Sequence, residues 1–336
     1  MARTALAVAA AALLLAAPLL LAEYSLAQLS FICIYVVAGA GLMLLVGYTG
    51  QISLGHAAFL GVGAYTEAIA QARGLPFPVS AAASGLLAAG CGALVGLPAL
   101  RLKGIYLAIA TLAFGFIAVE VFARWEALTG GNAGMAVAPV VLFGHRLGEE
   151  WEFYYLCLAV AVGAMFALAN LLRSPTGRAL TAIRDAEIPA RSLGIDAAHY
   201  KTVAFALSAG ATGIAGALYA HRIGFISPEA FDILLSIELL TMILVGGLGS
   251  AAGVVFGAAF LIAVPQALIL ARELLPEGIA RQSGLQPALF GLVLVLTVLF
   301  EPEGLNGLWL RLRSRARRGG AAPGRRRAYR KSERTP

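Results

Sequence analysis

The residues of this chain that could do chemistry are ionisable side chains set inside long apolar stretches. The carboxylates of Glu67, Glu120 and Glu238 and the imidazole of His56 fall within segments oily enough to lie in lipid. A charged group at membrane depth is costly, so each invites a functional hypothesis such as carrying an ion or binding a substrate. The competing interpretation is structural: a hydrogen bond to a neighbouring helix or a position near the membrane surface. Glu238 has the most apolar neighbours, in LLSIELLTMILVGG.

A second group of candidates lies in residues 173–201, RSPTGRALTAIRDAEIPARSLGIDAAHYK, which we call the polar segment. It is short, charged and flanked on both sides by apolar sequence. A segment of this length between membrane spans is too small to be a domain. It is therefore a loop, and we expect another molecule to contact it.

The sequence lacks the residue sets of common catalytic and cofactor sites. GGLGSAAG, residues 246–253, lacks the Lys-Ser/Thr pair of a phosphate-binding loop. No Ser, His and Asp set and no group of ligands with metal-site spacing is evident. Cys33, Cys91 and Cys157 lie singly in apolar runs, as small hydrophobic residues do. The chain is interpreted as a conduit without a metal or cofactor of its own, so any ATPase would be another polypeptide.

The composition identifies the elements that position these residues as membrane helices. Of the 336 residues, 60% are hydrophobic and 13% are charged, whereas a soluble protein carries about 25% charged residues. A spanning helix needs about 20 apolar residues. That length predicts an all-α polytopic membrane protein with about ten spans, within a range of eight to ten, near 5–22, 27–46, 52–71, 79–99, 105–123, 152–172, 201–221, 229–248, 251–271 and 285–300.

Three of these predicted segments have alternatives. Residues 5–22 resemble a secretory signal peptide, but the many spans behind them favour an anchor or a first span. Residues 47–63 are rich in glycine. Residues 229–265 form either two full spans or a broken or re-entrant helix.

The distribution of Lys and Arg predicts which loops share a side of the membrane. Basic residues follow the predicted fourth, sixth and tenth spans, so ten spans place both termini and the polar segment in the cytoplasm. The loop near 124–151 then lies outside. The chain divides into a membrane domain, 1–310, and a disordered cytoplasmic tail, 311–336. From Arg311 to Arg334 the tail carries eleven basic residues against Glu333, and its expected partner is the anionic lipid surface rather than nucleic acid.

The 39 glycines predict close helix packing, because small residues let helices approach in lipid. Gly210, Gly213 and Gly216 form one such stripe. Residues 42–64 also resemble residues 240–260, with Gly47 aligned to Gly246 and Gly50 to Gly249. This similarity hints at a repeat of two halves, as many transporters have.

Within the polar segment we expect Pro175 and Gly177 to end the incoming helix and 178–184 to form a short helix. Asp185 is the candidate N-cap of a second short helix, with Glu187 in its first turn. Pro189 would then remove a helical hydrogen bond, which indicates a later start. Gly194 is placed to end this helix in a left-handed conformation. Ile188, Leu193 and Ile195 give it an apolar face, suited to a partner's groove or to lipid headgroups.

Residues 177–220, from GRALTAIRDAEIPARSLGID onwards, resemble the cytoplasmic coupling loop and following span of permeases from branched-chain amino-acid ABC importers. Three further stretches agree in order and spacing: GYTGQISLGHAAFLGVGAY at 47–65, LTGGNAGM at 128–135 and SIELLTMILVGGLGSAAGVVFGAA at 236–259. The resemblance covers roughly 30–305. Pro189 departs from it, where a small residue such as Ala is expected.

The resemblance implies a set of partners. These are a second related permease subunit, two cytoplasmic ATPase subunits that bind ATP and Mg²⁺, and a periplasmic substrate-binding protein, assembled at the bacterial inner membrane. It also implies roles for residues at matching positions. The residues implied in ATPase coupling are Arg178, Arg184, Asp185, Glu187, Arg191 and Gly194. Those implied along the translocation pathway are Gln51, Ser53, His56 and Glu238. Those implied at the outer mouth are Thr129, Gly130, Gly131 and Asn132.

The expected substrates are Leu, Ile and Val, and an apolar conduit with few charges suits them. Permeases for urea, short amides and some aromatic acids share these signatures and stay as alternatives. A rival of another class is a secondary transporter that uses Glu238 or Glu67 as an ion carrier. The polar segment argues against it, since such a carrier has no need of a docking helix.

Overall fold

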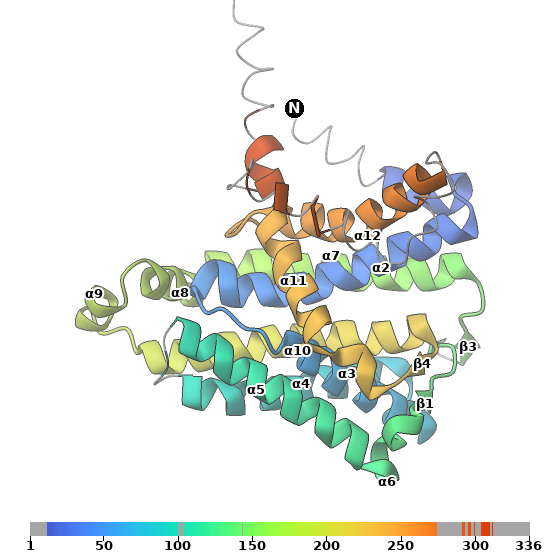
Figure 1. The fold of residues 1–336 in the computed structure, drawn as a ribbon, viewed down its shortest axis with the longest axis horizontal. Coiled ribbons are helices and arrows are strands. Elements are labelled where there is room, and N and C mark those ends of the chain that lie inside the picture. The colour runs from blue at the N-terminus through green and yellow to red at the C-terminus, as the bar shows by residue number, and fades with distance from the viewer. Residues whose placement is uncertain are drawn as a thin grey trace, which may run out of the picture.

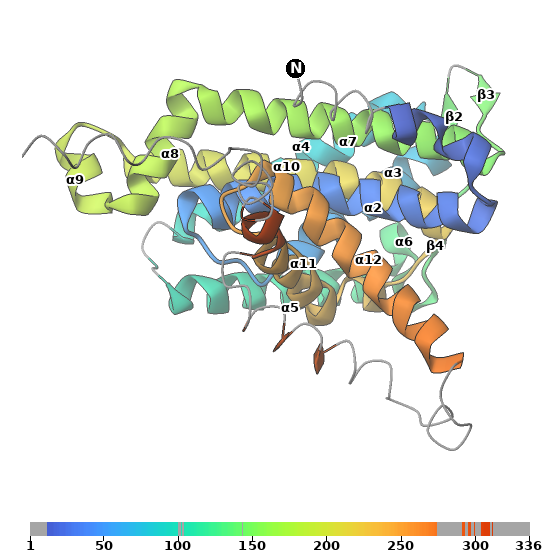
Figure 2. The same ribbon diagram turned by 90° about the horizontal axis from the view of Figure 1, so that it is seen from above.

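A computed structural model of the chain describes residues 12–99, 102, 104–142 and 144–273, with short pieces between 291 and 311. Most of the long helices run back and forth along one direction, and the helix formed by residues 233–246 crosses them (Figures 1 and 2). Their bounds are α2 (Glu23–Leu42), α3 (His56–Ala72), α4 (Phe77–Ala99), α5 (Ile105–Arg124), α7 (Glu150–Arg173), α10 (Ala197–Ile223), α11 (Ile233–Gly246) and α12 (Ala251–Glu273).

Shorter elements join the long helices. They are the π-helix η1 (Met43–Gly47), α6 (Glu126–Thr129), the 3-10 helices η2 (Gly131–Ala133) and η3 (Pro228–Phe231), α8 (Pro175–Asp185) and α9 (Glu187–Ser192). Four strands of two residues each are β1 (Met135–Ala136), β2 (Val141–Leu142), β3 (His145–Arg146) and β4 (Phe225–Ile226). They form two antiparallel pairs, β1 with β4 and β2 with β3. The described fold is therefore mostly helical, as predicted, and has two small strand pairs in its loops.

Among the described residues, six helices are long and apolar enough to cross a membrane. They agree within a few residues with six predicted spans. These helices are Glu23–Gly47, Phe77–Leu97, Ile105–Arg124, Glu150–Arg173, Ala197–Ile223 and Ala251–Ile269. The agreement follows from composition, since only an α-helix satisfies the backbone of such apolar segments in lipid.

Two predicted spans have different bounds in the structure. The one near 52–71 begins as a helix only at His56, because residues 50–55 leave the helical path after Gly50, whose φ is 69°. The one near 229–248 is the 14-residue helix α11, about 21 Å long, which is shorter than the hydrocarbon core of about 30 Å. Of the alternatives for 229–265, the broken helix is therefore the better description.

The first and last predicted spans lie partly outside the described residues. Residues 12–20 are helical, and this helix contacts α7. The hydroxyl of Tyr154 donates to the carbonyl of Leu14 at 2.9 Å, and that of Tyr155 donates to the carbonyl of Leu15 at 2.7 Å. Most of 285–300 and all of 312–336 are outside the described residues, so the ten-span count remains a prediction.

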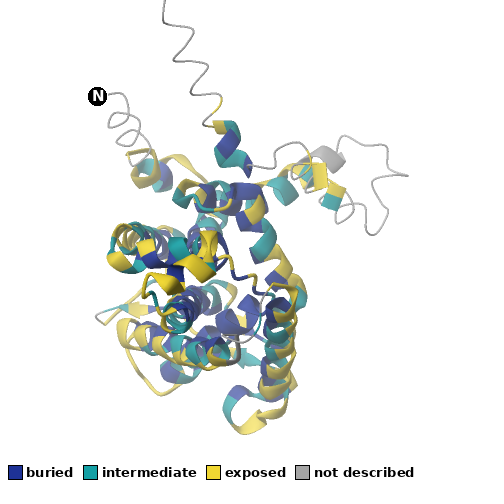
Figure 3. Cartoon of the chain, turned by 90° about the vertical axis from the view of Figure 1, so that its left-hand side faces the viewer, coloured by how far each residue is buried: buried dark blue, intermediate teal, exposed yellow. Residues whose placement is uncertain are grey.

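Helix α10 is the centre of the bundle and packs against α2, α3 and α4. Its glycines permit this, as predicted: a Cβ on Gly213 would overlap Ala88 of α4, and one on Gly63 of α3 would overlap the backbone of Gly213. Buried residues concentrate inside the bundle and exposed ones on its outer faces (Figure 3). Small side chains thus set the distances between the helices that carry the candidate residues.

The bundle has two chemically different ends. Helices α8 and α9 project from one end, while α6 and all the strands lie at the other (Figures 1 and 2). Leu102 and Leu107, beside the α4–α5 connection, pack in the same cluster as Leu180 of α8. Two of the segments predicted to share a side of the membrane, the α4–α5 connection and the polar segment, therefore lie at one end, and the predicted side of the basic tail stays a prediction because residues 312–336 lie outside the described residues.

Candidate functional site

Helix α8 begins immediately after α7 and is longer than the predicted 178–184. Ser174 caps it, accepting a hydrogen bond from the amide of Gly177 at 3.3 Å, and Pro175 occupies its first turn. Proline is well tolerated there because that amide has no helical partner. Gly177 lies inside the helix, where a Cβ would press on the backbone of Leu172. The break between helices is therefore at Ser174, and Gly177 permits the first turn of α8 to pack closely against the end of α7.

The start of α9 corrects one prediction and confirms another. Asp185 is the last residue of α8, and Ala186 is the N-cap of α9, without a side-chain cap. Pro189 then stands third in the helix, where its missing amide hydrogen costs no helical bond. The first such bond joins the amide of Ala190 to the carbonyl of Ala186 at 3.1 Å. The helix thus starts one residue later than an Asp185 cap would give, as Pro189 indicates.

Gly194 ends α9 as predicted. Its φ is 84°, and its amide donates to the carbonyl of Arg191 at 3.0 Å. The amide of Ile195 donates to the carbonyl of Ala190 at 3.1 Å. This pair of bonds is the Schellman motif, which needs a left-handed residue. Gly194 therefore shapes the loop and has no side chain to offer a partner.

Glu187 forms two ion pairs, one within α9 and one that holds α9 against α10. One carboxylate oxygen lies 2.6 Å from Nη2 of Arg191, and the other lies 3.1 Å from Nζ of Lys201. The Lys201 side chain is only 8% exposed. Because a buried ammonium without a partner is unstable, Glu187 is needed inside the loop. Its carboxylate is thus engaged before any partner protein arrives.

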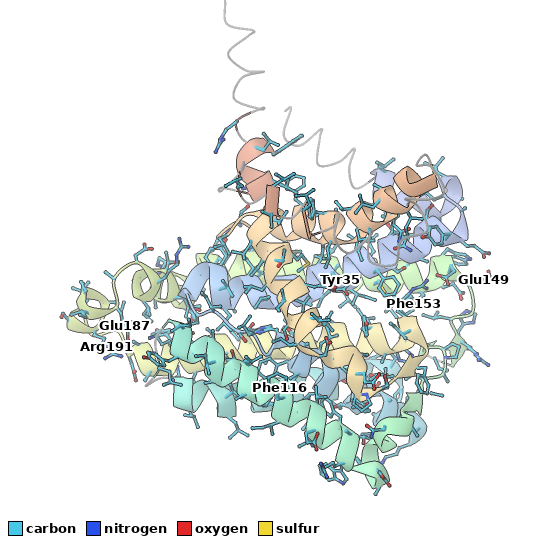
Figure 4. All side chains as sticks on the ribbon, viewed as in Figure 1. Tyr35, Phe116, Glu149, Phe153, Glu187 and Arg191 are labelled. Carbon is cyan, nitrogen blue, oxygen red and sulfur yellow. The ribbon has the colours of Figure 1, made fainter. Side chains whose placement is uncertain are left out.

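The outward surface of α9 is apolar with charged edges. Ile188 is 76% exposed and Leu193 is 83% exposed. Asp185 and Arg191 are exposed beside them, and Figure 4 places Glu187 and Arg191 at the tip of the molecule. Ile195, the third residue of the predicted apolar face, packs inward beside the cluster of Ile183, Ala190 and Ala197. Arg178, also exposed, donates to the carbonyl of Arg173 at 3.0 Å.

Arg184 points from α8 toward the bundle. Its Nη1 donates to the carbonyl of Gly47, the last residue of η1, at 2.5 Å. The hydroxyl of neighbouring Tyr48 donates to the carbonyl of Gly249 at 2.8 Å. Burial raises the pKa of the Tyr48 hydroxyl, and the positive charge of Arg184 opposes that rise. The two stretches that resemble each other in sequence thus meet beside Arg184, which sequence analysis did not predict.

Ser53 and His56 belong to one buried hydrogen-bond network. The ring nitrogens of His56 lie 2.9 Å from Oγ of Ser53 and 2.8 Å from Oγ of Ser208, which donates to the carbonyl of Gly41 at 2.7 Å. Gln51, in the irregular residues 50–55, is also buried, and its Oε1 has no hydrogen-bond partner. The network ties the irregular residues 50–55 to α2 and α10. Sequence analysis missed Ser208, because a serine in an apolar span carries no signal of its partner.

Glu238 lies apart from that network. It is exposed, on an outward stripe of α11 that also carries Leu234 and Ile237. Ser236 faces inward and accepts a hydrogen bond from the amide of Ala57 at 3.0 Å. A cavity of about 120 Å³ separates α11 from α5 and is lined by Leu54, Leu112, Gly115, Phe116, Val119, Phe231, Asp232, Ile233 and Ser236. The structure therefore does not bring Glu238 and His56 together.

The other two intramembrane carboxylates fit the structural interpretation. Glu67 is buried, accepts a hydrogen bond from Ser80 at 2.7 Å and lies 2.9 Å from Nε2 of His221. Glu120 forms an exposed ion pair with Arg124 one helical turn away. His221 was not predicted as a partner, since it lies 154 positions from Glu67.

The TGGN segment forms a tight turn at the end opposite α9. The hydroxyl of Thr129 donates to the carbonyl of Phe122 at 2.6 Å and accepts from the amide of Gly131 at 3.2 Å. Gly130 and Gly131 both have positive φ, at 73° and 58°. Asn132 is exposed at the tip. Glycine is required here, because a side chain would be strained in that conformation.

The fold and these sites define a multi-helix membrane protein with an amphipathic loop at one end. Residues 24–300 match the family described as branched-chain amino acid transport system / permease component. The chain belongs to this family, whose members named below are transport permease proteins and not enzymes.

Several curated proteins are similar over most of the chain. The high-affinity branched-chain amino acid transport system permease protein LivM of Escherichia coli K12 is 35% identical over 81% of this chain and 67% of its own length. The probable LivM of Methanocaldococcus jannaschii is 25% identical over 64% of this chain and 63% of its own. The autoinducer 2 import system permease protein LsrC of Enterobacter sp. strain 638 is 28% identical over 72% of this chain and 70% of its own. No solved structure matches.

Proposed function

We propose that this chain is one permease subunit of an ATP-driven importer that moves Leu, Ile and Val inward across a bacterial inner membrane. Two ATPase subunits would bind the ATP and Mg²⁺, and a periplasmic binding protein would deliver the substrate. The family and the names of the LivM relatives support the substrate class. The chain's own contribution would be the route through the membrane and the attachment of the ATPases.

The observation that carries this proposal is the exposed apolar surface of α9. Ile188 and Leu193 stand out from the end of the bundle with charged neighbours around them. Apolar residues at the centre of a patch with a charged rim are typical of a docking site. We assign this surface to the ATPase subunits, with Asp185, Arg191 and Arg178 at its rim. Glu187 and Gly194 would shape it from within.

The opposite end would receive the periplasmic binding protein. The turn at Thr129–Asn132 and the strand pairs lie there, at the far end of the bundle from α9 (Figure 1). In this orientation α8, α9 and both chain termini are cytoplasmic. We keep 1–310 as the membrane domain and assign the basic tail, 311–336, to the anionic lipid surface.

A second, related permease subunit would cover the outward stripe of α11. In a single chain this stripe would place the carboxylate of Glu238 against lipid, which is costly. Covering it with protein removes that cost and puts Glu238 beside the translocation pathway. Gln51, Ser53 and His56 would border the same pathway from the loop that precedes α3, while their hydrogen bonds fix the shape of that loop.

Two alternatives rest on particular observations. The LsrC relative is named for autoinducer 2 import, so autoinducer 2 is an alternative substrate, beside urea, short amides and aromatic acids. An ion-coupled secondary transporter would use Glu238 or Glu67 as its carrier. Glu67 suits that role poorly, because one of its oxygens already contacts both Ser80 and His221.

Uptake into proteoliposomes separates these proposals. The vesicles would contain this chain, its partner permease and the ATPases, with the binding protein and radiolabelled Leu, Val, urea or autoinducer 2 on the binding protein's side. We expect Leu and Val uptake only with ATP on the α9 side. Uptake by this chain alone under a proton or sodium gradient would overturn the importer proposal. Uptake of another compound in preference to Leu would overturn the substrate.

A further inference from the structure

We propose that Arg184 is a positioning residue that transmits the movement of α8 to two interrupted helices, one ending at Gly47 and the other at Gly246. This inference rests on the proposed function and changes the expected role of Arg184. The residue would act inside the permease, after the ATPases have docked elsewhere on the loop.

The first contact is with the end of η1. The final carbonyls of a helix lack helical partners and carry partial negative charge. The carbonyl of Val46 accepts from the amide of Gly50 at 3.2 Å, and that of Leu45 accepts from the amide of Gln51 at 3.1 Å. The carbonyl of Gly47 is taken by the guanidinium of Arg184. Arg184 therefore supplies a bond to the end of η1 from a different helix.

The second contact is with the turn that follows α11. A Cβ added at Gly249 would lie 3.3 Å from Nη1 of Arg184, and one added at Gly50 would lie 3.4 Å from its Cγ. The amide of Gly249 donates to Sδ of Met43 at 3.3 Å, and its carbonyl accepts from Tyr48. Two glycine turns from distant parts of the chain thus both lie against the side chain of Arg184.

The same face of α8 holds a second attachment to η1. Leu180, one helical turn before Arg184, is fully buried in a cluster with Leu44 and Leu45. Residues four apart share a helix face, so Leu180 and Arg184 together attach α8 to η1. A π-helix such as η1 interrupts regular helical bonding and is frequent at functional sites. Displacement of α8 would therefore first move η1, which continues α2, and the turn that follows α11.

A docking role would place Arg184 differently. Its side chain is 42% exposed, yet its Nη1 is committed to Gly47 inside the protein. Ile188 of the next helix and Leu193, its C-cap, are far more exposed. The geometry thus separates attachment, on α9, from transmission, through Arg184.

The test compares Arg184→Ala, Arg184→Lys and Leu193→Asp in the complete complex. Three quantities are measured: ATPase subunits retained on purification, ATP hydrolysis, and Leu uptake per ATP in proteoliposomes. We expect Arg184→Ala to retain the ATPases and hydrolyse ATP while uptake per ATP falls about tenfold, within the usual range of a coupling free energy. Arg184→Lys, which keeps the charge, should recover part of that loss, and Leu193→Asp should lose the ATPases.

Loss of the ATPases in Arg184→Ala would overturn the inference in favour of docking, and unchanged uptake per ATP would overturn it outright. If Arg184→Ala does not insert, Tyr48→Phe decides the matter, since it removes the bond to Gly249 and leaves Arg184 in place. Reduced uptake per ATP in Tyr48→Phe supports the inference, and unchanged uptake per ATP overturns it. Absence of ATP-dependent uptake in the unaltered complex would instead be a failure of the proposed function.

Discussion

Helices α8 and α9 are neighbours in the chain and face opposite ways. Helix α8 buries Leu180 against the bundle and Ile183 against Ala190 of α9 and Ala197 of α10. Helix α9 buries only Ala190 and presents Ile188 and Leu193 to the outside. A single residue, Ala186, separates them, and its extended backbone turns the chain between the two faces.

This difference assigns two tasks to one loop. A surface that receives a partner must be exposed, whereas a surface that passes on movement must be packed against the parts that move. The polar segment meets both requirements with two short helices, and Glu187 and Gly194 fix the second of them, α9, at the start of α10. Substitutions in α8 should therefore affect the permease itself, and those in α9 should affect its association with the ATPases.

The largest expected difference comes from the same substitution in each helix. Leu180→Ala removes a fully buried side chain and should lower the free energy of unfolding by about 2–5 kcal/mol. Leu193→Ala removes an exposed one and should change it by less than about 0.5 kcal/mol. Denaturant unfolding of the purified permease in detergent measures both. Equal losses would show that the two helices do not differ as described.

Binding of the ATPase subunits should depend on the exposed Leu193 instead. Leu193→Asp places a charge at the centre of the α9 surface and should weaken ATPase binding by about 2 kcal/mol, or roughly 30-fold. Ser192→Asp adds the same charge at the next exposed position and serves as the control. Affinity measured by surface-immobilised ATPase should fall much less for the control. A similar loss in both variants would indicate a general charge effect and no specific contact.

Glu187→Gln should loosen α9 without removing it. The change leaves the buried Lys201 ammonium and Arg191 with a neutral partner, at a cost of about 1.5 kcal/mol. Hydrogen exchange at the amides of Gly194 and Ile195 should accelerate roughly tenfold. Asp185→Asn, at an exposed carboxylate, is the matched control, and unaltered exchange in Glu187→Gln would remove Glu187 from its proposed holding role.

The smallest expected effect is at the end of α9. Gly194→Ala puts a Cβ on a residue with φ of 84° and should cost about 1 kcal/mol. Gly148→Ala, where an added Cβ meets open space and φ is not positive, should be close to neutral. Thermal unfolding compares the two. If Gly194→Ala is as harmless as the control, the Schellman turn does not hold α9 in place.

Composition was sufficient to predict six long helices that could cross a membrane, because an apolar segment of about 20 residues has few other stable conformations in lipid. The positions at which helices are interrupted were harder to predict. Glycines at 47–63 marked an irregular region, yet nothing in the sequence specified that residues 50–55 would leave the helix or that α11 would stop at 14 residues. Such endings depend on tertiary contacts, including the approach of Gly246 to Gly253.

In the candidate site, too, features set by local sequence were predicted better than features set by distant contacts. Local chemistry correctly predicted Gly194 as the end of α9, since a positive φ is a property of one residue. It misplaced the N-cap at Asp185, because the preceding helix competes for that residue. The inward direction of Arg184 was unpredictable, since its acceptor, Gly47, lies 137 positions away. Contacts between distant segments cannot be derived from one sequence when the acceptor is a backbone carbonyl.

The most direct test of the account is disulfide cross-linking from the two ends of the bundle. Leu193→Cys and Asn132→Cys would be introduced singly into a chain with Cys33, Cys91 and Cys157 replaced by Ala, in the assembled complex. We predict that position 193 cross-links to an ATPase subunit bearing surface cysteines and that position 132 does not. Cross-linking of the ATPase to position 132, or to neither position while uptake still requires ATP, would contradict the assignment of α9 as the attachment surface.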